Sequence, residues 1–388
     1  MHSRIEWVGE NCRLLAAISR EFAQTQPFRG LTIGTGIHLE PKTVALLLTL
    51  KSGGARVVST GNLNTTQPGA IAHLRDRGVT VIGSATRDPD EHRGYLAHVL
   101  AERPALLLDN GGDLFDLFQR NPHPGLLGGT EETTSGRKRL TPLRDALRLP
   151  ILVINDSPIK QFAENEHAVG QSVLESYLRI TNRITNGQRV TVFGYGACGR
   201  GVAANFRNAY AKVSVVDIDP LKRLQAHLDG YDVPSRDAAV AGADLIVTVT
   251  GGHRVLGPAD LRLLKDGAIL ANAGHFPVEI DAPAMAGADG VQETRHFEDG
   301  LQSIRLADGR TVHVIAEGHM LNLAGPRPMG NSIESMDLGF ALQARCLEAV
   351  ALGKVSPESC VVPVPRDIDE RVANAYLDLC YTELSSRA

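Results

Sequence analysis

The amino-acid sequence predicts an α/β protein of two lobes, each built on a doubly wound parallel sheet. The chain has 388 residues, whereas one domain usually needs roughly 100–200. Glycine accounts for 39 of them, an excess that suits a protein with many tight turns. Short apolar segments that end at glycines alternate with helical segments along most of the chain. This alternation is typical of parallel strands joined by helices.

The first half of the chain alternates strands with helices. The expected strands cover residues 30–36, 56–62, 80–85, 105–114 and 151–156. A helix expected over 41–55 ends at Gly53 and Gly54, and another is expected over 70–79. Helices of this length between strands predict parallel neighbours rather than hairpins.

A second α/β series follows a long helix that is expected over 165–185. Its expected strands cover residues 189–196, 212–219, 244–251 and 268–274, and a helix extends from the first of them to about Ala211. The tail from Pro363 to Ala388 is expected to be helical and polar.

Composition and charge disfavour several classes of protein. A net charge of −4 and a sequence pI of about 6.4 disfavour a binder of nucleic acid or of a membrane surface. No run reaches the roughly 18 apolar residues of a membrane span, and the first residues are charged, so we expect a cytoplasmic protein without a signal peptide. Scattered cysteines and histidines predict neither disulfides nor a metal site. The cysteines are Cys12, Cys198, Cys346, Cys360 and Cys380.

A glycine-rich segment in the middle of the chain predicts a dinucleotide site. It fits G-x-G-x-x-G between an expected strand and an expected helix, and consists of Gly194, Tyr195, Gly196, Ala197, Cys198 and Gly199. Such glycines let the backbone approach a pyrophosphate at a helix N-terminus. Asp217 follows about 20 residues later and would accept hydrogen bonds from the adenosine ribose. Because Ile218 follows it instead of an arginine, NAD is expected rather than NADP. A glycine turn without a ligand is the alternative.

The position of this fingerprint assigns a role to each lobe. It lies in the middle of the chain, so the lobe before it is expected to carry the substrate. This organisation predicts an oxidoreductase-like protein with a cleft between its lobes.

Several segments, which together cover most of residues 30–345, also match a known family in order and sequence. They are GIHLEPKTVALLLTL (36–50), LLLDNGGDL (106–114), GTEETTSG (129–136), NDSPIKQFAENEHAVGQS (155–172), GYGACGRG (194–201), NAGHFPVEID (272–281) and AEGHMLNLA (316–324). With these segments the chain resembles the S-adenosyl-L-homocysteine hydrolase family. The resemblance implies a tightly held, reused NAD, a nucleoside substrate, and a homo-oligomer, either a tetramer or a dimer. It also implies a discontinuous substrate-binding domain (1–160 and 333–361), an NAD-binding Rossmann domain (172–330) and a C-terminal helical tail (362–388).

The chemistry that the resemblance implies begins at the ribose. Oxidising the 3′ hydroxyl of a nucleoside to a ketone acidifies the neighbouring 4′ proton. A base removes that proton, the 5′ group leaves by β-elimination, and water can add to the enone before the stored hydride reduces the ketone. NAD supplies the redox chemistry, and the protein supplies position and acid–base groups.

The resemblance implies five catalytic side chains. Lys160 aligns near the 3′ hydroxyl and the 4′ carbon, where burial is expected to lower its pKa and make a neutral amine available as the base. Glu164, where the family usually has aspartate, would orient Lys160 or relay its proton, and Asn165 matches a family asparagine. His38 matches the acid beside the 5′ leaving group. His275 matches the histidine near the nicotinamide and the interdomain hinge.

Further side chains are expected to hold the substrate or the cofactor. Glu132 matches the carboxylate that grips the ribose hydroxyls, and Asn322 is expected at the nicotinamide amide. The residues expected to contact NAD outside the fingerprint are Thr133, Thr134, Ser135, Asn165, Asn272 and Asn322.

The sequence departs from the family pattern around the nucleoside. Asn110 replaces an active-site carboxylate near the 5′ side, and an amide neither takes nor gives a proton at neutral pH. In the run that follows His38, Glu40 and Lys42 differ from the family. Lys42, a pure donor, replaces a carboxylate expected to accept from the adenine amino group. Asn331 replaces a loop histidine, and the family's C-terminal lysine and tyrosine tail is not found before Ala388.

Three functions are consistent with this pattern. The residues for oxidation and proton abstraction are kept, whereas those that read the base and handle the leaving group are changed. We therefore expect a diverged nucleoside 5′-dehydratase, a lyase that removes water to leave a 4′,5′-unsaturated nucleoside. The alternatives are a genuine S-adenosyl-L-homocysteine hydrolase, which releases homocysteine and adenosine, and an inactive NAD-binding regulator.

Overall fold

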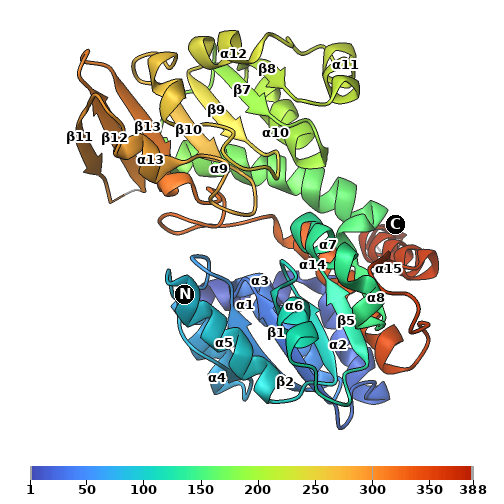
Figure 1. Cartoon of the computed structure of the whole chain (residues 1–388). Coiled ribbons are helices and arrows are strands. Elements are labelled where there is room, and N and C mark those ends of the chain that lie inside the picture. The colour runs from blue at the N-terminus through green and yellow to red at the C-terminus, as the bar shows by residue number, and fades with distance from the viewer. Residues whose placement is uncertain (1, 299, 386–388) are drawn as a thin grey trace. The chain divides into compact units, whose positions relative to one another are not determined.

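The chain is divided into two units, each built on one seven-stranded sheet (Figure 1). The computed structural model describes residues 2–298 and 300–385. The first unit comprises Met1–Gln161 and Ile333–Ala388, and the second comprises Phe162–Ser332. The prediction of an α/β fold with two doubly wound sheets is confirmed, although the second sheet also has an antiparallel part.

The first sheet is entirely parallel, with the order β14-β6-β5-β4-β1-β2-β3. Most of its residues are buried, as expected for a parallel sheet covered on both faces. The strands are β1 (Thr32–Ile37), β2 (Arg56–Gly61), β3 (Thr80–Val81), β4 (Leu106–Asp109), β5 (Gly128–Glu131), β6 (Ile151–Val153) and β14 (Val362–Pro363).

Some strand boundaries differ from the sequence prediction for a local reason. The strand expected to reach Leu114 ends at Asp109, because Gly111 and Gly112 have positive φ angles and turn the chain. Strand β5 was not expected, since its sequence GGTE has little intrinsic strand preference. Gly129 fits there because a Cβ would lie 1.8 Å from the backbone oxygen of Leu107 on the adjacent strand.

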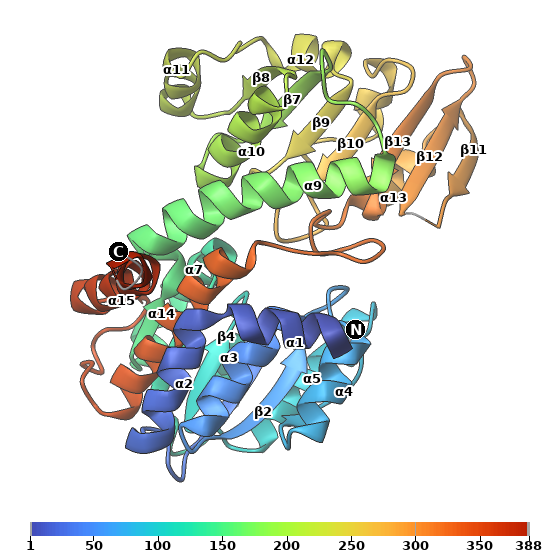
Figure 2. The ribbon, with the colours of Figure 1, turned by 180° about the vertical axis from the view of Figure 1, so that it is seen from behind.

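Helices cover both faces of the first sheet. Figure 2 shows α1, α2 and α3 on one face, and Figure 1 shows α5 and α6 on the other. Helix α2 has one apolar stripe, in which Leu14, Leu15, Ile18 and Phe22 are buried. The α-helices of this unit are α1 (His2–Asn11), α2 (Arg13–Thr25), α3 (Pro41–Ser52), α4 (Pro68–Asp76), α5 (Pro89–Ala101), α6 (Asp113–Arg120), α7 (Thr134–Leu140), α8 (Arg144–Leu147), α14 (Ile333–Ala351) and α15 (Arg366–Ser385).

The second sheet has the order β11-β12-β13-β10-β9-β7-β8. Strands β7, β8, β9, β10 and β13 are parallel to one another. Strands β11 and β12 extend the sheet beyond β13 with antiparallel pairing, which the sequence analysis did not predict. The strands are β7 (Arg189–Phe193), β8 (Lys212–Val216), β9 (Leu245–Thr248), β10 (Ile269–Asn272), β11 (Val291–His296), β12 (Leu301–Leu306) and β13 (Thr311–Ile315).

The helix expected over 165–185 begins earlier and has two parts. A π-helix spans Lys160–Ala168 and continues as α9 (Val169–Thr181), which ends where Asn182 adopts a left-handed conformation. Helix α9 packs on α10 (Ala197–Asn208) through an edge-to-face contact of Tyr177 with Phe206. The remaining α-helices are α11 (Pro220–Leu228), α12 (Arg236–Gly242) and α13 (Ala282–Ala286). No helix within 2–298 or 300–385 is long and apolar enough to cross a membrane.

Candidate active site

Five polar side chains of the first unit follow the carboxyl ends of five parallel strands. His38 follows β1, Asn62 follows β2, Asn110 follows β4 and Glu132 follows β5, while Lys160 comes shortly after β6. Strand β1 pairs with β2 on one side and with β4 on the other. From β1 the chain first adds β2 and β3 on one side and then adds β4, β5 and β6 on the other, so the strand order reverses direction between β1 and β4. Open α/β sheets bind ligands at such a switch point, outside the carboxyl ends of the strands.

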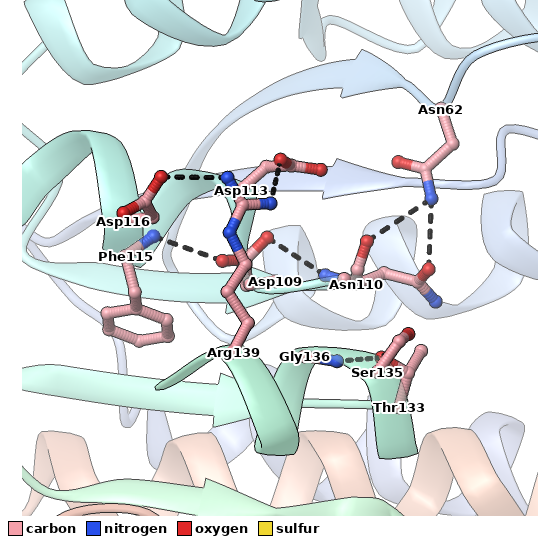
Figure 3. Close-up of polar contacts among 12 residues, drawn as sticks. Asn62, Asp109, Asn110, Asp113, Phe115, Asp116, Thr133, Ser135, Gly136 and Arg139 are labelled. Carbon is pink, nitrogen blue, oxygen red and sulfur yellow. Dashed lines mark hydrogen bonds and ion pairs between the residues drawn. The ribbon is translucent and has the colours of Figure 1, made fainter. Parts of the chain in front are cut away.

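A chain of polar contacts connects four of these residues. The Asn62 Nδ2 atom donates to Asn110 Oδ1 at 2.9 Å, as Figure 3 shows, and Asn110 Nδ2 donates to Glu132 Oε2 at 2.6 Å. The Lys160 Nζ atom lies 3.7 Å from Glu132 Oε1. All four side chains are buried. The structure thus brings together three predicted residues, Asn110, Glu132 and Lys160. Asn62 was missed, and its only signal was its place at a strand end.

Two buried carboxylates hold the loops that carry Asn110 and Glu132. Asp109 accepts from the backbone N–H groups of Asn110 and Phe115, both at 3.0 Å (Figure 3). Glu131 accepts from the N–H groups of Gly111 and Gly112 and from Thr133. Burial and nearby Asp113 raise the pKa of Asp109 to about 7, and burial and Asp109 raise the pKa of Glu131. These carboxylates therefore support the site from within the protein.

The segment Thr133–Ser135 forms the N-terminus of α7. The Thr133 hydroxyl donates to Glu131 at 2.7 Å and accepts from the Gly136 N–H at 2.9 Å, so it caps the helix. Ser135 Oγ lies 3.0 Å from Thr133 Oγ1, and Thr134 is exposed. Contact of these three residues with NAD stays a prediction.

His38 is held from two sides in the loop between β1 and α3. Its Nδ1 atom lies 2.6 Å from Thr65 Oγ1, and its backbone oxygen accepts from the Thr43 hydroxyl at 2.6 Å. The ring is partly buried. Its Nδ1 atom is thus engaged by Thr65.

Glu40 and Lys42 form a buried ion pair at the start of α3. The Lys42 Nζ atom lies 2.9 Å from Glu40 Oε2, and the Glu40 side chain also caps the helix by accepting from the Lys42 N–H at 3.2 Å. Each side chain is no more than 7% exposed. Each charge would be costly to bury alone, and the pairing of Glu40 with Lys42 offsets part of that cost.

Lys160 reaches its place through a turn anchored to the C-terminal helix. Ser157 Oγ donates to Asp369 Oδ1 of α15 at 2.5 Å and accepts from the Ile159 N–H at 3.1 Å. Lys160 then opens the π-helix that also carries Glu164 and Asn165. π-Helical segments are rare and frequent at functional sites. Glu164 and Asn165 belong to the second unit, and their catalytic roles stay predictions.

The glycine-rich loop of the second unit follows β7 and opens α10. Gly194 has a φ of +98°, and a Cβ on Gly199 would lie 1.9 Å from the Gly194 backbone oxygen. A Cβ on Gly196, by contrast, would meet nothing within 4 Å. The first and third glycines are therefore required by the turn itself, whereas the second borders open space beside the N-terminus of α10. Ala197 and Cys198 are the first two residues of that helix.

Asp217 follows β8 and lies beside the glycine loop. Its Oδ2 atom accepts from the Tyr195 N–H at 2.7 Å, and its Oδ1 atom accepts from the Asp219 N–H at 2.9 Å. The neighbouring Ile218 is 99% exposed. Asp217 thus fixes the loop and presents a carboxylate at the end of β8, as the predicted dinucleotide site requires.

Asn322, Asn331 and Ser172 form a second cluster in this unit. Asn322 Nδ2 donates to Ser172 Oγ at 2.9 Å, and Ser172 donates to Asn331 Oδ1 at 3.0 Å. Among the residues that the structure describes, buried Asn322 Oδ1 has no hydrogen-bond partner. A predicted cofactor residue and a predicted substrate residue therefore lie together, and Ser172, which connects them, was missed.

Asn272 ends β10 and organises the turn that carries His275. Its Oδ1 atom accepts from the Gly274 N–H at 2.7 Å, and its Nδ2 atom donates to the backbone oxygens of Gly318 and Phe276 at 2.9 and 3.0 Å. The His275 ring packs edge-on against Phe276. Since the Asn272 side chain is fully buried and bonded within the protein, its contact with NAD stays a prediction.

Comparison with known proteins agrees with this arrangement. A family model described as S-adenosyl-L-homocysteine hydrolase matches residues 2–124, and one described as its NAD binding domain matches residues 165–327. An adenosylhomocysteinase from Thermotoga maritima is 39% identical over 97% of this chain and 93% of its own length. The chain belongs to the S-adenosyl-L-homocysteine hydrolase family.

Two further relatives in this family have a different name. An S-inosyl-L-homocysteine hydrolase from Methanothermobacter thermautotrophicus is 37% identical and covers 98% of this chain and 92% of the relative. The enzyme of the same name from Methanopyrus kandleri is 38% identical, with 98% and 90% covered. The predicted membership of the S-adenosyl-L-homocysteine hydrolase family is therefore confirmed, and the relatives carry names with two different nucleosides.

The cofactor of this S-adenosyl-L-homocysteine hydrolase family member is NAD, and residues of the second unit fit it. The open space at Gly196 suits a pyrophosphate at the N-terminus of α10. Asp217 suits the ribose hydroxyls, and exposed Ile218 offers no cation for a 2′-phosphate. The Asn322 oxygen that lacks a partner among the described residues is an acceptor for an amide donor such as that of nicotinamide.

Proposed function

We propose that this enzyme removes water from a nucleoside with a 5′ hydroxyl and leaves a 4′,5′-unsaturated nucleoside. When bound by residues such as Gly196, Asp217 and Asn322, NAD would supply the redox chemistry, which is reversible hydride exchange at C3′. The side chains of the first unit then have two tasks, which are to remove the 4′ proton and to protonate the leaving oxygen.

Lys160 is the base of this proposal. It is buried beside Glu132, whose Oε1 atom lies 3.7 Å from Nζ. When the amine takes the 4′ proton, the electron pair of the C4′–H bond forms the C4′=C5′ double bond, and the C5′–O bond breaks. The Glu132 carboxylate stabilises the ammonium that results.

His38 is the acid. Hydroxide is a poor leaving group, so the departing oxygen needs a proton as the C5′–O bond breaks. The Nδ1 atom of His38 is engaged by Thr65, so we assign the transferred proton to Nε2. The proton on Nε2 passes to the leaving oxygen, and water departs. Solvent returns a proton to His38 and takes one from Lys160.

The observation that carries the proposal is the set of contacts made by Asn110. Its oxygen accepts from Asn62 and its nitrogen donates to Glu132, so both ends of the amide are used inside the protein. At this place the family has a carboxylate, and the Asn110 amide cannot act as a base that activates water for addition to the enone. The absence of this activation favours the alkene as the final product.

The test is incubation of the purified enzyme with adenosine, inosine and S-adenosyl-L-homocysteine, followed by mass spectrometry. We expect one 5′-hydroxyl nucleoside to lose the mass of one water molecule, slow or no release of homocysteine, and loss of the reaction in His38→Ala. Homocysteine release at about 1 s⁻¹ or faster, an ordinary enzyme rate, would overturn the proposal. No turnover by an NAD-loaded protein would favour a regulator.

A second candidate function is hydrolysis of an S-nucleosidyl-homocysteine whose base carries a carbonyl group. The buried Glu40–Lys42 pair favours it, because the Lys42 ammonium can only donate and suits a carbonyl oxygen rather than an amino group. Two relatives are named S-inosyl-L-homocysteine hydrolase. Adding S-inosyl-L-homocysteine to the panel distinguishes the two functions, since only the hydrolase converts it to homocysteine and inosine, whereas elimination without water addition would leave an unsaturated nucleoside.

The family also supports a homo-oligomer as part of the proposal, either a tetramer or a dimer. Light scattering of the purified protein after size-exclusion chromatography measures the oligomer directly, and a monomer at working concentration would contradict it.

A further inference from the structure

The turn after β2, residues 62–66, adjoins the loop that carries His38. The Asn62 N–H donates to the Ile37 oxygen at 3.1 Å, and the Gln67 N–H donates to the Leu39 oxygen at 2.8 Å. Within the turn, the Thr66 hydroxyl donates to the Asn62 oxygen at 2.8 Å. Backbone bonds on both sides of His38 therefore set where this turn lies relative to the imidazole.

Thr65 is the residue of this turn that contacts the imidazole. Its Oγ1 atom lies 2.6 Å from His38 Nδ1. The Thr43 hydroxyl, which donates to the His38 backbone oxygen at 2.6 Å, holds the same residue from α3. The Thr65 contact at the ring and the Thr43 contact at the backbone thus both hold His38 in place.

The direction of the Thr65 contact follows from the protonated state of the acid. Thr65 Oγ1 also lies 3.4 Å from the Asn62 backbone oxygen, and a carbonyl oxygen can only accept. In the imidazolium, the form of His38 that gives up a proton as the acid, Nδ1 carries hydrogen and can only donate, so the Thr65 oxygen accepts from it and the hydroxyl hydrogen can turn toward the Asn62 oxygen. In neutral imidazole the tautomer that keeps hydrogen on Nδ1 leaves the lone pair on Nε2, and in the imidazolium both nitrogens carry hydrogen.

We infer that Thr65 is a positioning residue for the elimination, because it holds the Nδ1–H group of His38 in both protonation states. Only Nε2 then changes its proton, and the ring does not reorient when that proton passes to the leaving oxygen. The inference rests on the proposed role of His38 as the acid, and nothing in the family resemblance assigns a role to Thr65.

The test compares two leaving groups in Thr65→Val, which removes the acceptor with little change in shape, and in Thr65→Ser, which keeps it. The probes are adenosine, inosine and their 5′-chloro-5′-deoxy derivatives, because chloride leaves without a proton. In Thr65→Val we expect elimination of the 5′ hydroxyl to slow by ~10- to 100-fold, with chloride loss and the absorbance of reduced NAD little changed. Thr65→Ser should retain most of the rate.

If Thr65→Val slows elimination equally for both leaving groups, or slows the formation of reduced NAD, the role of Thr65 is merely structural and the inference is overturned. A second measurement does not depend on the substrate. Nitrogen-15 NMR of the free protein, with the His38 signals assigned by their loss in His38→Gln, should show hydrogen on Nδ1 in the neutral ring. Hydrogen on Nε2 overturns the inference. If the wild-type enzyme turns over no 5′-hydroxyl nucleoside, the proposed function fails and the role of Thr65 in the elimination fails with it, while the NMR result still decides whether Thr65 holds the Nδ1–H group of His38.

Discussion

Asp109 and Glu131 are register partners on the adjacent parallel strands β4 and β5, and both carboxyl groups are buried. Each strand ends at its carboxylate, and the next residues, Asn110 and Glu132, are hydrogen-bonded to each other at 2.6 Å. The two buried groups bind backbone N–H donors of the following loops. Asn110 and Glu132 of the candidate site thus directly follow the two buried carboxylates Asp109 and Glu131.

Replacing Glu131 with glutamine should destabilise the first unit. Four donors of Gly111, Gly112 and Thr133 converge on the Glu131 oxygens, and an amide offers only one oxygen. We expect a loss of about 1–3 kcal/mol of unfolding free energy for each donor left unsatisfied. Denaturant unfolding measures it. Glu102→Gln, on an exposed ion pair with Arg56, is the control and should cost at most about 1 kcal/mol.

Asn110→Asp should make activity more sensitive to alkaline pH. The substitution places a carboxylate oxygen about where Asn110 Nδ2 lies, 2.6 Å from Glu132. Two carboxylates so close share one proton, and both cannot readily ionise. We expect the variant to lose kcat/KM relative to the wild-type enzyme as the pH rises, because the wild-type amide does not titrate. Parallel pH profiles for the two proteins would contradict this prediction.

Lys160→Gln should stop turnover and leave NAD bound. The residue belongs to the first unit, whereas the glycine loop and Asp217 belong to the second. Loss of a positioned base typically costs about 10²–10⁴-fold in rate. The rate is measured by mass spectrometry, and the NAD is measured after the protein is denatured. The matched control is Lys354→Gln, at an exposed lysine. Near-normal activity in Lys160→Gln would rule out Lys160 as the base.

Two glycine substitutions should separate folding from NAD binding. Gly199→Ala places a Cβ 1.9 Å from the Gly194 oxygen, so it should lower the melting temperature even without NAD. Gly196→Ala meets no protein atom within 4 Å, so the NAD-free protein should be unaffected. It should nevertheless weaken NAD binding by at least about tenfold, because the new methyl group occupies space expected for the pyrophosphate. Thermal melts with increasing NAD test both variants, and equal behaviour would contradict the prediction.

Asp337→Asn should reveal a pH-dependent contribution to stability. Asp337 accepts from the Leu14 and Leu15 N–H groups at the start of α2, and burial raises its pKa from 3.8 to about 6. Because the pKa is higher in the folded protein, protonation of Asp337 contributes to the free energy of unfolding. This contribution is complete below pH 3.8 and is lost as the pH rises through about 6. The wild-type protein should therefore gain about 1 kcal/mol over Asp337→Asn between pH 8 and pH 5.

Denaturant unfolding of both proteins at the two pH values measures this gain. The control is Asp145→Asn, whose side chain is 99% exposed. It should show no such difference. If the cost of Asp337→Asn is the same at both pH values, the buried carboxyl does not titrate as expected.

The sequence by itself determined the features that depend on contiguous residues. The glycine fingerprint, Asp217 after the next strand, and the run around Lys160 each lie within one strand–turn–helix unit. Local spacing is sufficient there, because the strand, the turn and the helix N-terminus together form the phosphate site. Family membership and the α/β class follow from the same local order of segments.

Only the tertiary structure decided which side chains meet. Asn62 and Asn110 are 48 residues apart, and Asn110 and Glu132 are 22 apart. Their contacts depend on the order and register of β2, β4 and β5, which no local pattern specifies. The same is true of Thr65 beside His38 and of Ser172 beside Asn322, since each pair joins separate segments. The physical reason is that side-chain hydrogen bonds form across neighbouring strand ends, and strand order is set by packing of the whole sheet rather than by any one segment.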